Sequence, residues 1–293
     1  MRKVVSKQPE YDYNKIGVTA LMVAHLRSFS NMPYAKDIDN LIGAGKTWRK
    51  IEGDNAIMRI MELAPGIEAR GISINNILRN ENAMQILELA SGMSPRGLQF
   101  TEDLSVTYVE TDLQPMATQK RSIVRRISGD SQRRGRHYIL DADAMSYADL
   151  SDVSGVFLNK PLYIVSEGLL NHLNGEERSL VAHNVRCLLG VFGGAWILSD
   201  IEDKERIMRR PDSGRNNSVM KLTGRNIFDN VPSNQEETRK EFESAGFTVE
   251  KLPIFSDLSK ISSFRSLNIN KEDINPLIQK SHWQYTWILR LRN

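Results

Sequence analysis

Ile86–Gly97, with the sequence ILELASGMSPRG, is the stretch that decides the fold of this chain. Its apolar start has the character of a buried β-strand, which runs into the small residues Ala90, Ser91 and Gly92. Small residues remove side-chain bulk at the carboxyl end of a strand, where open α/β sheets bind ligands. The stretch therefore predicts a strand, a ligand-binding turn and the restart of the chain as a helix.

Further strands follow this turn at regular intervals. Short apolar runs separated by about twenty residues are typical of βαβ units around a parallel sheet. This pattern assigns the chain to the α/β class. We predict seven strands, at Gln85–Leu89, Ser105–Glu110, His137–Asp141, Pro161–Ser166, Gly194–Asp200, Phe247–Leu252 and Tyr285–Leu291.

The residues before the first strand carry helical spacing instead. Val18–Leu26 and Ile57–Leu63 place apolar residues at helical intervals. We therefore expect residues 1–80 to form a helical extension or lid, packed on a main domain of residues 81–293. Residues 203–237 are polar and poor in strand signal, so we expect them to form an insertion that covers the ligand edge of the sheet.

The composition is that of a soluble globular protein. The 293 residues are 40% hydrophobic and 26% charged, with a formal net charge of +3, which is enough chain to bury a full α/β core. No apolar run reaches the roughly 18 residues of a membrane span, and the start lacks a secretory signal, so we expect a cytoplasmic protein. The single cysteine, Cys187, excludes an internal disulfide and a cysteine-based zinc site. We expect it in the core, and we expect no metal site.

One short segment concentrates positive charge. Because it has no interleaved aromatic residues, we interpret it as a solvated helix-and-loop surface, with a site for nucleic acid or an acidic partner as the alternative. Its basic residues are Lys120, Arg121, Arg125, Arg126, Arg133, Arg134 and Arg136.

Acidic residues stand at the ends of the predicted strands. Glu88 ends the first strand, and Asp112 lies just past the second, twenty residues after Gly92. At that position an acidic side chain accepts hydrogen bonds from the diol of a ribose, although a solvated turn acid or a helix N-cap explains Asp112 alone equally well. The third strand ends in Asp141-Ala142-Asp143, and the fourth runs into Ser166-Glu167-Gly168.

These carboxylates match the needs of one nucleoside cofactor. S-adenosylmethionine (SAM) carries a sulfonium, an amino acid head, a ribose diol and an adenine. Asp143, or Asp141 in its place, would lie near the adenine amino group. A buried Glu167 needs a cationic partner, which is either the amino group of SAM or an arginine. The turn lacks two of the three glycines of the dinucleotide pattern, which disfavours an NAD-linked dehydrogenase.

Three motifs resemble those of the leucine carboxyl methyltransferase family, the Ppm-type O-methyltransferases of the SAM-dependent class. The family's turn, near E-L-G-A-G-L-D-T-R, corresponds to Glu88–Arg96, its E-V-D-L-P motif to Val109–Leu113, and its A-E-G-V-L-x-Y-L motif to Ser166–Leu173. The resemblance implies a Rossmann-like sheet of seven strands with the last one antiparallel. It also implies SAM as the cofactor and S-adenosylhomocysteine as the product.

The resemblance extends to the helical region and completes a set of site residues. Gly66–Arg70 is similar to the segment that carries an arginine to the SAM carboxylate, which makes Arg70 the candidate for that contact. Thr19–Arg27 resembles a helix of bacterial members, and we interpret Arg27 as a surface arginine. The cofactor-binding residues expected are Arg70, Glu88, Ala90, Ser91, Gly92, Asp112, Leu113, Asp141, Ala142, Asp143, Glu167 and Gly168.

The chain also departs from the family pattern. Ala90 replaces the first glycine of the turn, where we expect it to occupy a negative φ, and Ser94 replaces an aspartate. His172 stands in place of a tyrosine. Histidine near a methyl donor acts as a general base for a hydroxyl nucleophile, while a packed helix residue is the alternative interpretation. His183 and His282 are more distant candidates for the same role.

The sequence thus predicts a SAM-dependent O-methyltransferase. The acceptor oxygen belongs to a carboxylate or a hydroxyl of a small or carrier-tethered metabolite, with the helical extension and the insertion as its lid. One alternative is methylation of a protein C-terminus. The other is a binding protein that kept the fold and lost the chemistry, for which Ala90 and Ser94 are the grounds.

Overall fold

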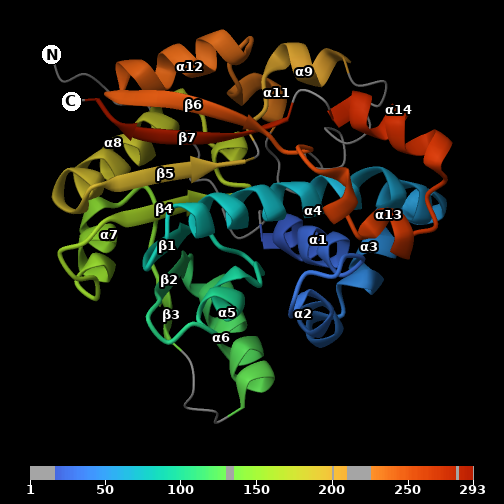
Figure 1. The fold of residues 1–293 in the computed structure, drawn as a ribbon, viewed down its shortest axis with the longest axis horizontal. Helices are drawn as coiled ribbons and strands as arrows, with labels where there is room; N and C mark the ends of the chain where they lie inside the picture. The colour runs from blue at the N-terminus through green and yellow to red at the C-terminus, as the bar shows by residue number, and fades with distance from the viewer. Residues whose placement is uncertain (1–16, 130–134, 200, 210–225, 282–283, 293) are drawn as a thin grey trace, which may run out of the picture.

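The computed structural model describes residues 17–129, 135–199, 201–209, 226–281 and 284–292. A sheet of seven strands in the order β3-β2-β1-β4-β5-β7-β6 forms its centre (Figure 1). β1 to β5 are parallel, and β7 runs antiparallel between β5 and β6. The strands are β1 Gln85–Leu89, β2 Thr107–Asp112, β3 Arg136–Asp141, β4 Leu162–Ser166, β5 Gly194–Leu198, β6 Phe247–Pro253 and β7 Tyr285–Leu291. The seven predicted strands and the antiparallel last strand are confirmed. β2 begins and ends two residues later than predicted, and β5 ends at Leu198, while the predicted end at position 200 lies outside the described residues.

Helices surround this sheet. The longest, α4, crosses one face of it (Figure 1). α8 begins with a capping box, in which the side chains of Asn174 and Glu177 each accept a hydrogen bond from the other's backbone N–H. The α-helices are α1 Gly17–Arg27, α2 Ala35–Ile42, α3 Ala44–Glu52, α4 Ala56–Asn80, α5 Arg96–Phe100, α6 Gln114–Ser128, α7 Tyr147–Ser154, α8 Gly175–Phe192, α9 Lys204–Arg209, α11 Ile227–Asn230, α12 Gln235–Ser244, α13 Ser263–Ser266 and α14 Lys271–Ser281. The short 3-10 helices are η2 Gly53–Asn55, η3 Leu170–His172 and η4 Leu258–Lys260.

Both faces of the sheet are covered, which explains why its central strands read as continuous apolar runs. Leu87 and Leu89 of β1 share a core with residues of α7, α8 and α12. Ile86, whose side chain points to the other face, packs with α4 residues such as Ile74 and Leu78. Alternate residues of one strand therefore enter two separate cores.

The predicted helical character of the N-terminal region is confirmed over residues 17–80. α1, α3 and α4 share a core that includes Leu26, Trp48 and Ile60. Of the predicted insertion, α9 and α11 are described, and residues 210–225 lie outside the described part of the chain. Cys187 of α8 is half-buried and not a core residue as expected, because it lies beside the exposed His183 one turn away.

The strand order places a crevice at the carboxyl end of β1. The chain moves from β1 outward to β2 and β3, then returns to the other side of β1 with β4 and β5. At such a switch point the connections leave the sheet in opposite directions, and open α/β sheets bind ligands there. The segments that follow β1, β2 and β4 meet at this crevice.

Candidate active site

A pocket occupies the crevice at the carboxyl ends of the strands. Its empty volume is about 1500 Å³, including the part open to solvent. Most residues of the expected cofactor set line it: Arg70, Ala90, Ser91, Gly92, Asp112, Leu113, Ala142, Asp143, Glu167 and Gly168. Two expected residues, Glu88 and Asp141, are not part of its lining. Helix α1 contributes Thr19, Ala20, Val23 and Arg27 to the wall.

The turn after β1 is more strained than expected. Ala90 has a φ of 48° and Gly92 a φ of 49°, so the alanine occupies the left-handed region and not the negative φ that we predicted. A side chain in that region costs about 1–2 kcal/mol. Gly92 also lies close to α1, because a Cβ there would be 2.9 Å from the Cβ of Ala20. The turn brings backbone into the pocket at this cost in local strain.

Asp112 is fixed at the pocket wall by backbone hydrogen bonds. Its Oδ2 accepts from the N–H of Gly92 at 2.7 Å and its Oδ1 from the N–H of Leu113 at 2.8 Å. Burial raises the pKa of Asp112, although these hydrogen bonds oppose the shift. Each carboxylate oxygen has a second lone pair, so Asp112 can accept further hydrogen bonds from a diol. It does not cap α6, whose N-cap residue is Leu113.

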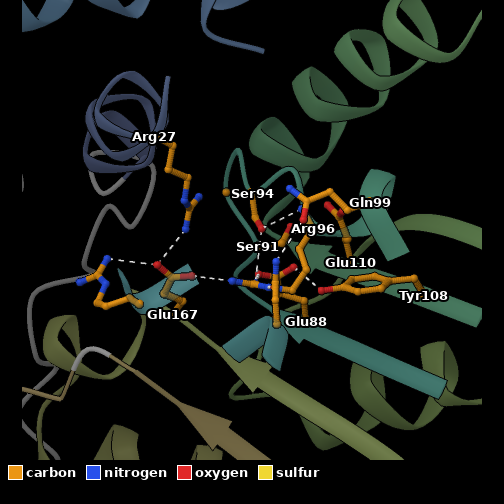
Figure 2. A network of polar contacts seen from close by, with 12 residues as sticks. Arg27, Glu88, Ser91, Ser94, Arg96, Gln99, Tyr108, Glu110 and Glu167 are labelled. Carbon is orange, nitrogen blue, oxygen red and sulfur yellow. Dashed lines mark hydrogen bonds and ion pairs between the residues drawn. The ribbon is translucent and has the colours of Figure 1, made fainter. Parts of the chain in front are cut away.

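Glu167, just after β4, is surrounded by three arginines. Its Oε1 lies 2.8 Å from an Nη of Arg27 and 3.2 Å from one of Arg70, and its Oε2 lies 2.8 Å from one of Arg96. Figure 2 shows Arg27 and Arg96 reaching the carboxylate from different directions. Burial would raise the pKa of Glu167, but the arginines outweigh it and hold the pKa well below its usual range. The sequence left open whether the cationic partner of Glu167 is an arginine or the amino group of SAM. The structure shows arginine partners.

Arg27 corrects our interpretation of α1. It is only 4% exposed and lines the pocket, so it is not the surface arginine that we expected. Its Nε and that of Arg70 have no hydrogen-bond partner within the described residues. Two guanidinium groups at the pocket wall therefore retain N–H groups for a further acceptor.

Glu88 faces away from the pocket because it lies on the same side of β1 as Ile86. Its carboxylate accepts from Tyr108 Oη at 2.7 Å and contacts the guanidinium of Arg96 (Figure 2). Arg96 also donates to Oδ1 of Asn75 at 2.8 Å. Burial lowers the pKa of Arg96, but Glu88 and Glu167 more than offset this and raise it. Glu88 thus holds Arg96, which in turn holds Glu167.

The buried charges near Glu167 do not balance. Three guanidinium groups, those of Arg27, Arg70 and Arg96, face two carboxylates, those of Glu88 and Glu167. A single added carboxylate would neutralise the cluster, and arginines bind carboxylates well through paired N–H groups. The pocket wall formed by Arg27 and Arg70 is therefore suited to a carboxylate.

Lys120 is an exception to the solvated surface expected of the basic segment. Arg125, Arg126 and Arg136 are exposed as expected, and Arg133 and Arg134 lie outside the described residues. Lys120 is 1% exposed, its Nζ lies 3.1 Å from the Oγ of Ser91, and it contacts the carboxylate of Glu110. The other oxygen of Glu110 lies 3.0 Å from Nε2 of His137. Burial would raise the pKa of Glu110, but Lys120 and His137 lower it to about 2. Lys120 thus links Ser91 of the turn to the buried carboxylate of Glu110.

At the end of β3 the two aspartates differ in position. Asp143 lines the pocket, and its Oδ1 accepts from the N–H of Met145 at 2.9 Å. Asp141 is exposed and pairs with Arg121 at 2.8 Å, because its side chain extends toward α6. Of the two competitors for the adenine side, the structure brings Asp143 into the pocket.

His172, the candidate base, also lines the pocket. It ends η3 and is 7% exposed, and Asn171 and Glu202 belong to the same lining. His183 lies on α8 outside the lining, and His282 lies outside the described residues. Glu202 was not singled out in the sequence, because it follows β5 in a segment with no recognised motif.

Two further properties concern the described part of the chain. It contains no group of three or more histidine, cysteine or acidic residues that would suit a metal ion. None of its helices has the length and apolar character needed to cross a membrane.

Comparisons with known proteins support the fold. No protein-family model matches this sequence, and a search of the curated proteins finds no match. The structure is similar to a DUF574 family protein from Streptomyces avermitilis MA-4680, with a TM-score of 0.57 and 16% identity over 94% of this chain and 97% of that one.

Two methyltransferase structures are similar at a TM-score of 0.50 each. Magnesium protoporphyrin IX methyltransferase (ChlM) from Synechocystis PCC 6803, with bound S-adenosylhomocysteine, is 11% identical over 85% of this chain and 94% of that one. The methyltransferase domain of bacterial CtHen1 is 12% identical over 77% of this chain and 98% of that one. The chain therefore has the seven-stranded, Rossmann-like α/β fold of SAM-dependent methyltransferases.

Proposed function

We propose that this protein is a SAM-dependent methyltransferase that binds SAM in the pocket described above. The observation that carries the proposal is that one pocket combines Asp112 at the end of β2 with Arg27 and Arg70 beside Glu167 at the end of β4. A diol-binding carboxylate and an excess of guanidinium groups match the two polar ends of SAM on either side of its sulfur. The bound S-adenosylhomocysteine in the similar ChlM structure supports the same ligand class.

Different residues of the pocket bind different parts of the cofactor. Asp112 accepts hydrogen bonds from the ribose hydroxyls, and the backbone N–H groups of Gly92 and Leu113 keep its carboxylate in place. Arg70 and Arg27 receive the carboxylate of the amino acid head, and Glu167 holds both guanidinium groups in position. The small side chains of Ala90, Ser91 and Gly92 allow close approach, and Ala142 and Asp143 face the adenine side.

The chemistry is a methyl transfer. When bound, SAM supplies a methyl group on a positively charged sulfur, which is already an excellent leaving group. The protein's main task is therefore to hold the acceptor in line with that group and to exclude water. We propose that His172, which is buried and lines the pocket, accepts the proton of a hydroxyl acceptor.

We further propose an oxygen acceptor on a small or carrier-tethered metabolite, and a relationship to the leucine carboxyl methyltransferase family. The three strand-end motifs support that relationship. A cytoplasmic location is part of the proposal. The alternatives are methylation of a protein C-terminus and a binding protein without activity, and the strained Ala90 remains the feature that favours the latter.

Calorimetric titration with SAM tests the proposal. We expect the wild-type protein to bind SAM and Arg70→Ala to weaken the affinity by about 2 kcal/mol, the value of a charge-assisted hydrogen bond. Arg49→Ala, which removes an exposed arginine of α3, is the matched control and should leave the affinity unchanged. Absence of SAM binding in the wild-type protein would refute the proposal. Binding without methylation of any acceptor in a metabolite extract or a protein lysate would favour the inactive alternative.

A further inference from the structure

Arg96 supports the pocket without being part of its lining. It is 3% exposed and is absent from the described residues that line the pocket, whereas Arg27, Arg70 and Glu167 are among them. It follows the turn after β1 as the first residue of α5. One of its Nη atoms lies 2.8 Å from Oε2 of Glu167. Any influence of Arg96 on a ligand in the pocket therefore passes through Glu167.

Each nitrogen of the Arg96 side chain has an acceptor. One Nη contacts the carboxylate of Glu88, and the other donates to Oε2 of Glu167 at 2.8 Å (Figure 2). Nε donates to Oδ1 of Asn75 at 2.8 Å. Glu88 is held in turn by Oη of Tyr108 at 2.7 Å. Because the guanidinium group is planar and has acceptors in three directions, it presents a fixed donor to Glu167.

These contacts commit Glu167 to arginines. Its Oε1 contacts Arg27 and Arg70, and its Oε2 contacts Arg96. A carboxylate offers about four lone-pair positions, and three of them are used by these guanidinium groups. Only 2% of the Glu167 side chain is exposed. Glu167 is therefore poorly placed to receive a further cation such as the amino group of a ligand.

The same wall keeps donors for an anion. The Nε atoms of Arg27 and Arg70 have no hydrogen-bond partner within the described residues, and both side chains line the pocket. We propose, building on the proposed function, that Arg96 is a positioning residue. By engaging the second oxygen of Glu167, it makes this wall select the carboxylate of the cofactor's amino acid head over its amino group.

Loss of the bond from Arg96 would change both sides of this selection. The second oxygen of Glu167 would become free to attract the amino group of the head. The released carboxylate would also compete with the ligand for the N–H groups of Arg27 and Arg70. Lysine keeps the positive charge of Arg96 but has a single nitrogen, which cannot reach acceptors in three directions. Arg96→Lys therefore removes the geometry and keeps the charge.

Two analogues of S-adenosylhomocysteine test the selection on the full-length protein. The deaminated analogue lacks only the amino group of the head, and the decarboxylated analogue lacks only its carboxylate, so both keep the adenosine and the thioether. Calorimetric titration measures the dissociation constant of each. We expect the wild-type protein to bind the deaminated analogue about tenfold more tightly than the decarboxylated one, the scale of a charge-assisted hydrogen bond. A ratio near one would overturn the inference.

Variants test the role of Arg96 itself. Arg96→Lys should reduce the ratio to about threefold or less, mainly by weakening the deaminated analogue. Arg49→Lys, at an exposed position on α3, is the matched control and should keep the wild-type ratio. A purely structural role of Arg96 would weaken both analogues equally, so an unchanged ratio in folded Arg96→Lys would overturn the positioning role.

The outcomes separate this inference from the function on which it rests. If S-adenosylhomocysteine does not bind to the wild-type protein, the proposed function fails. If it binds and the two analogues bind equally well, only the inference is overturned. If Arg96→Lys does not fold, Asn75→Ala replaces it, because it removes the acceptor at Nε of Arg96 and should lower the ratio by a smaller amount. An unchanged ratio in that variant would contradict the positioning role.

Discussion

Single residues of the turn after β1 carry strain that the sequence partly indicated. Ala90 stands where relatives of the resembled family have glycine, and its φ of 48° shows why glycine is preferred there. We predict that Ala90→Gly raises the free energy of unfolding by about 0.5–1 kcal/mol. Relief of about 1–2 kcal/mol of strain exceeds the added flexibility of the unfolded chain. Urea denaturation measures the change, and a loss of stability would show that the alanine is not strained.

Glu110 makes the free energy of unfolding depend on pH. Its pKa falls from 4.5 in the unfolded reference to about 2 in the folded protein, so its contribution is fully present above about pH 4.5 and is lost as the pH falls toward 2. We predict that Glu110→Gln lowers stability at pH 7 and reduces the fall in unfolding free energy between pH 4.5 and 2 by about 3 kcal/mol. Urea denaturation across this pH range checks it, with the exposed Asp54→Asn as control. An unchanged slope would contradict the buried pairing with Lys120.

Some residues of the pocket could be predicted from the sequence, and others could not. Asp112 and Glu167 were identified because a strand-end acid marks the ligand edge of a parallel sheet. Glu88 was expected at the ligand, but strand residues alternate between faces, and Glu88 shares a face with Ile86. Arg27 and Arg96 end segments that match family motifs, but the motifs did not indicate their partner, because the contacts with Glu167 are made across the fold.

At the scale of elements, α1 closes the pocket by packing on the turn. A Cβ on Gly92 would strain the backbone at φ 49° and would meet Ala20 of α1 at 2.9 Å. We predict that Gly92→Ala lowers the free energy of unfolding by about 2 kcal/mol.

A double-mutant cycle separates the two causes of that loss. Ala20→Gly removes the methyl group that Gly92→Ala would meet, so the double variant should recover the steric part of the loss and keep the backbone part. Strictly additive effects would show that α1 does not press on the turn in solution.

For the molecule as a whole, the seven strands were accessible from the sequence, while their order and the way distant segments meet in the pocket were not. The seven apolar runs are long enough to mark strands, and parallel strands buried on both faces leave a continuous apolar signal. The lining residues His172, Glu202 and Ile227 come from η3, the segment after β5 and α11, which no shared motif connects. Glu202 and Ile227 thus enter the site through tertiary contacts alone.

A crystal structure of the protein with S-adenosylhomocysteine bound is the most direct test that this pocket holds the cofactor. We predict the ribose hydroxyls within hydrogen-bonding distance of Asp112 and the carboxylate of the amino acid head on Arg70 and Arg27. The sulfur should point toward His172. A ligand bound elsewhere, or one in this pocket with its ribose away from Asp112, would contradict the proposed site.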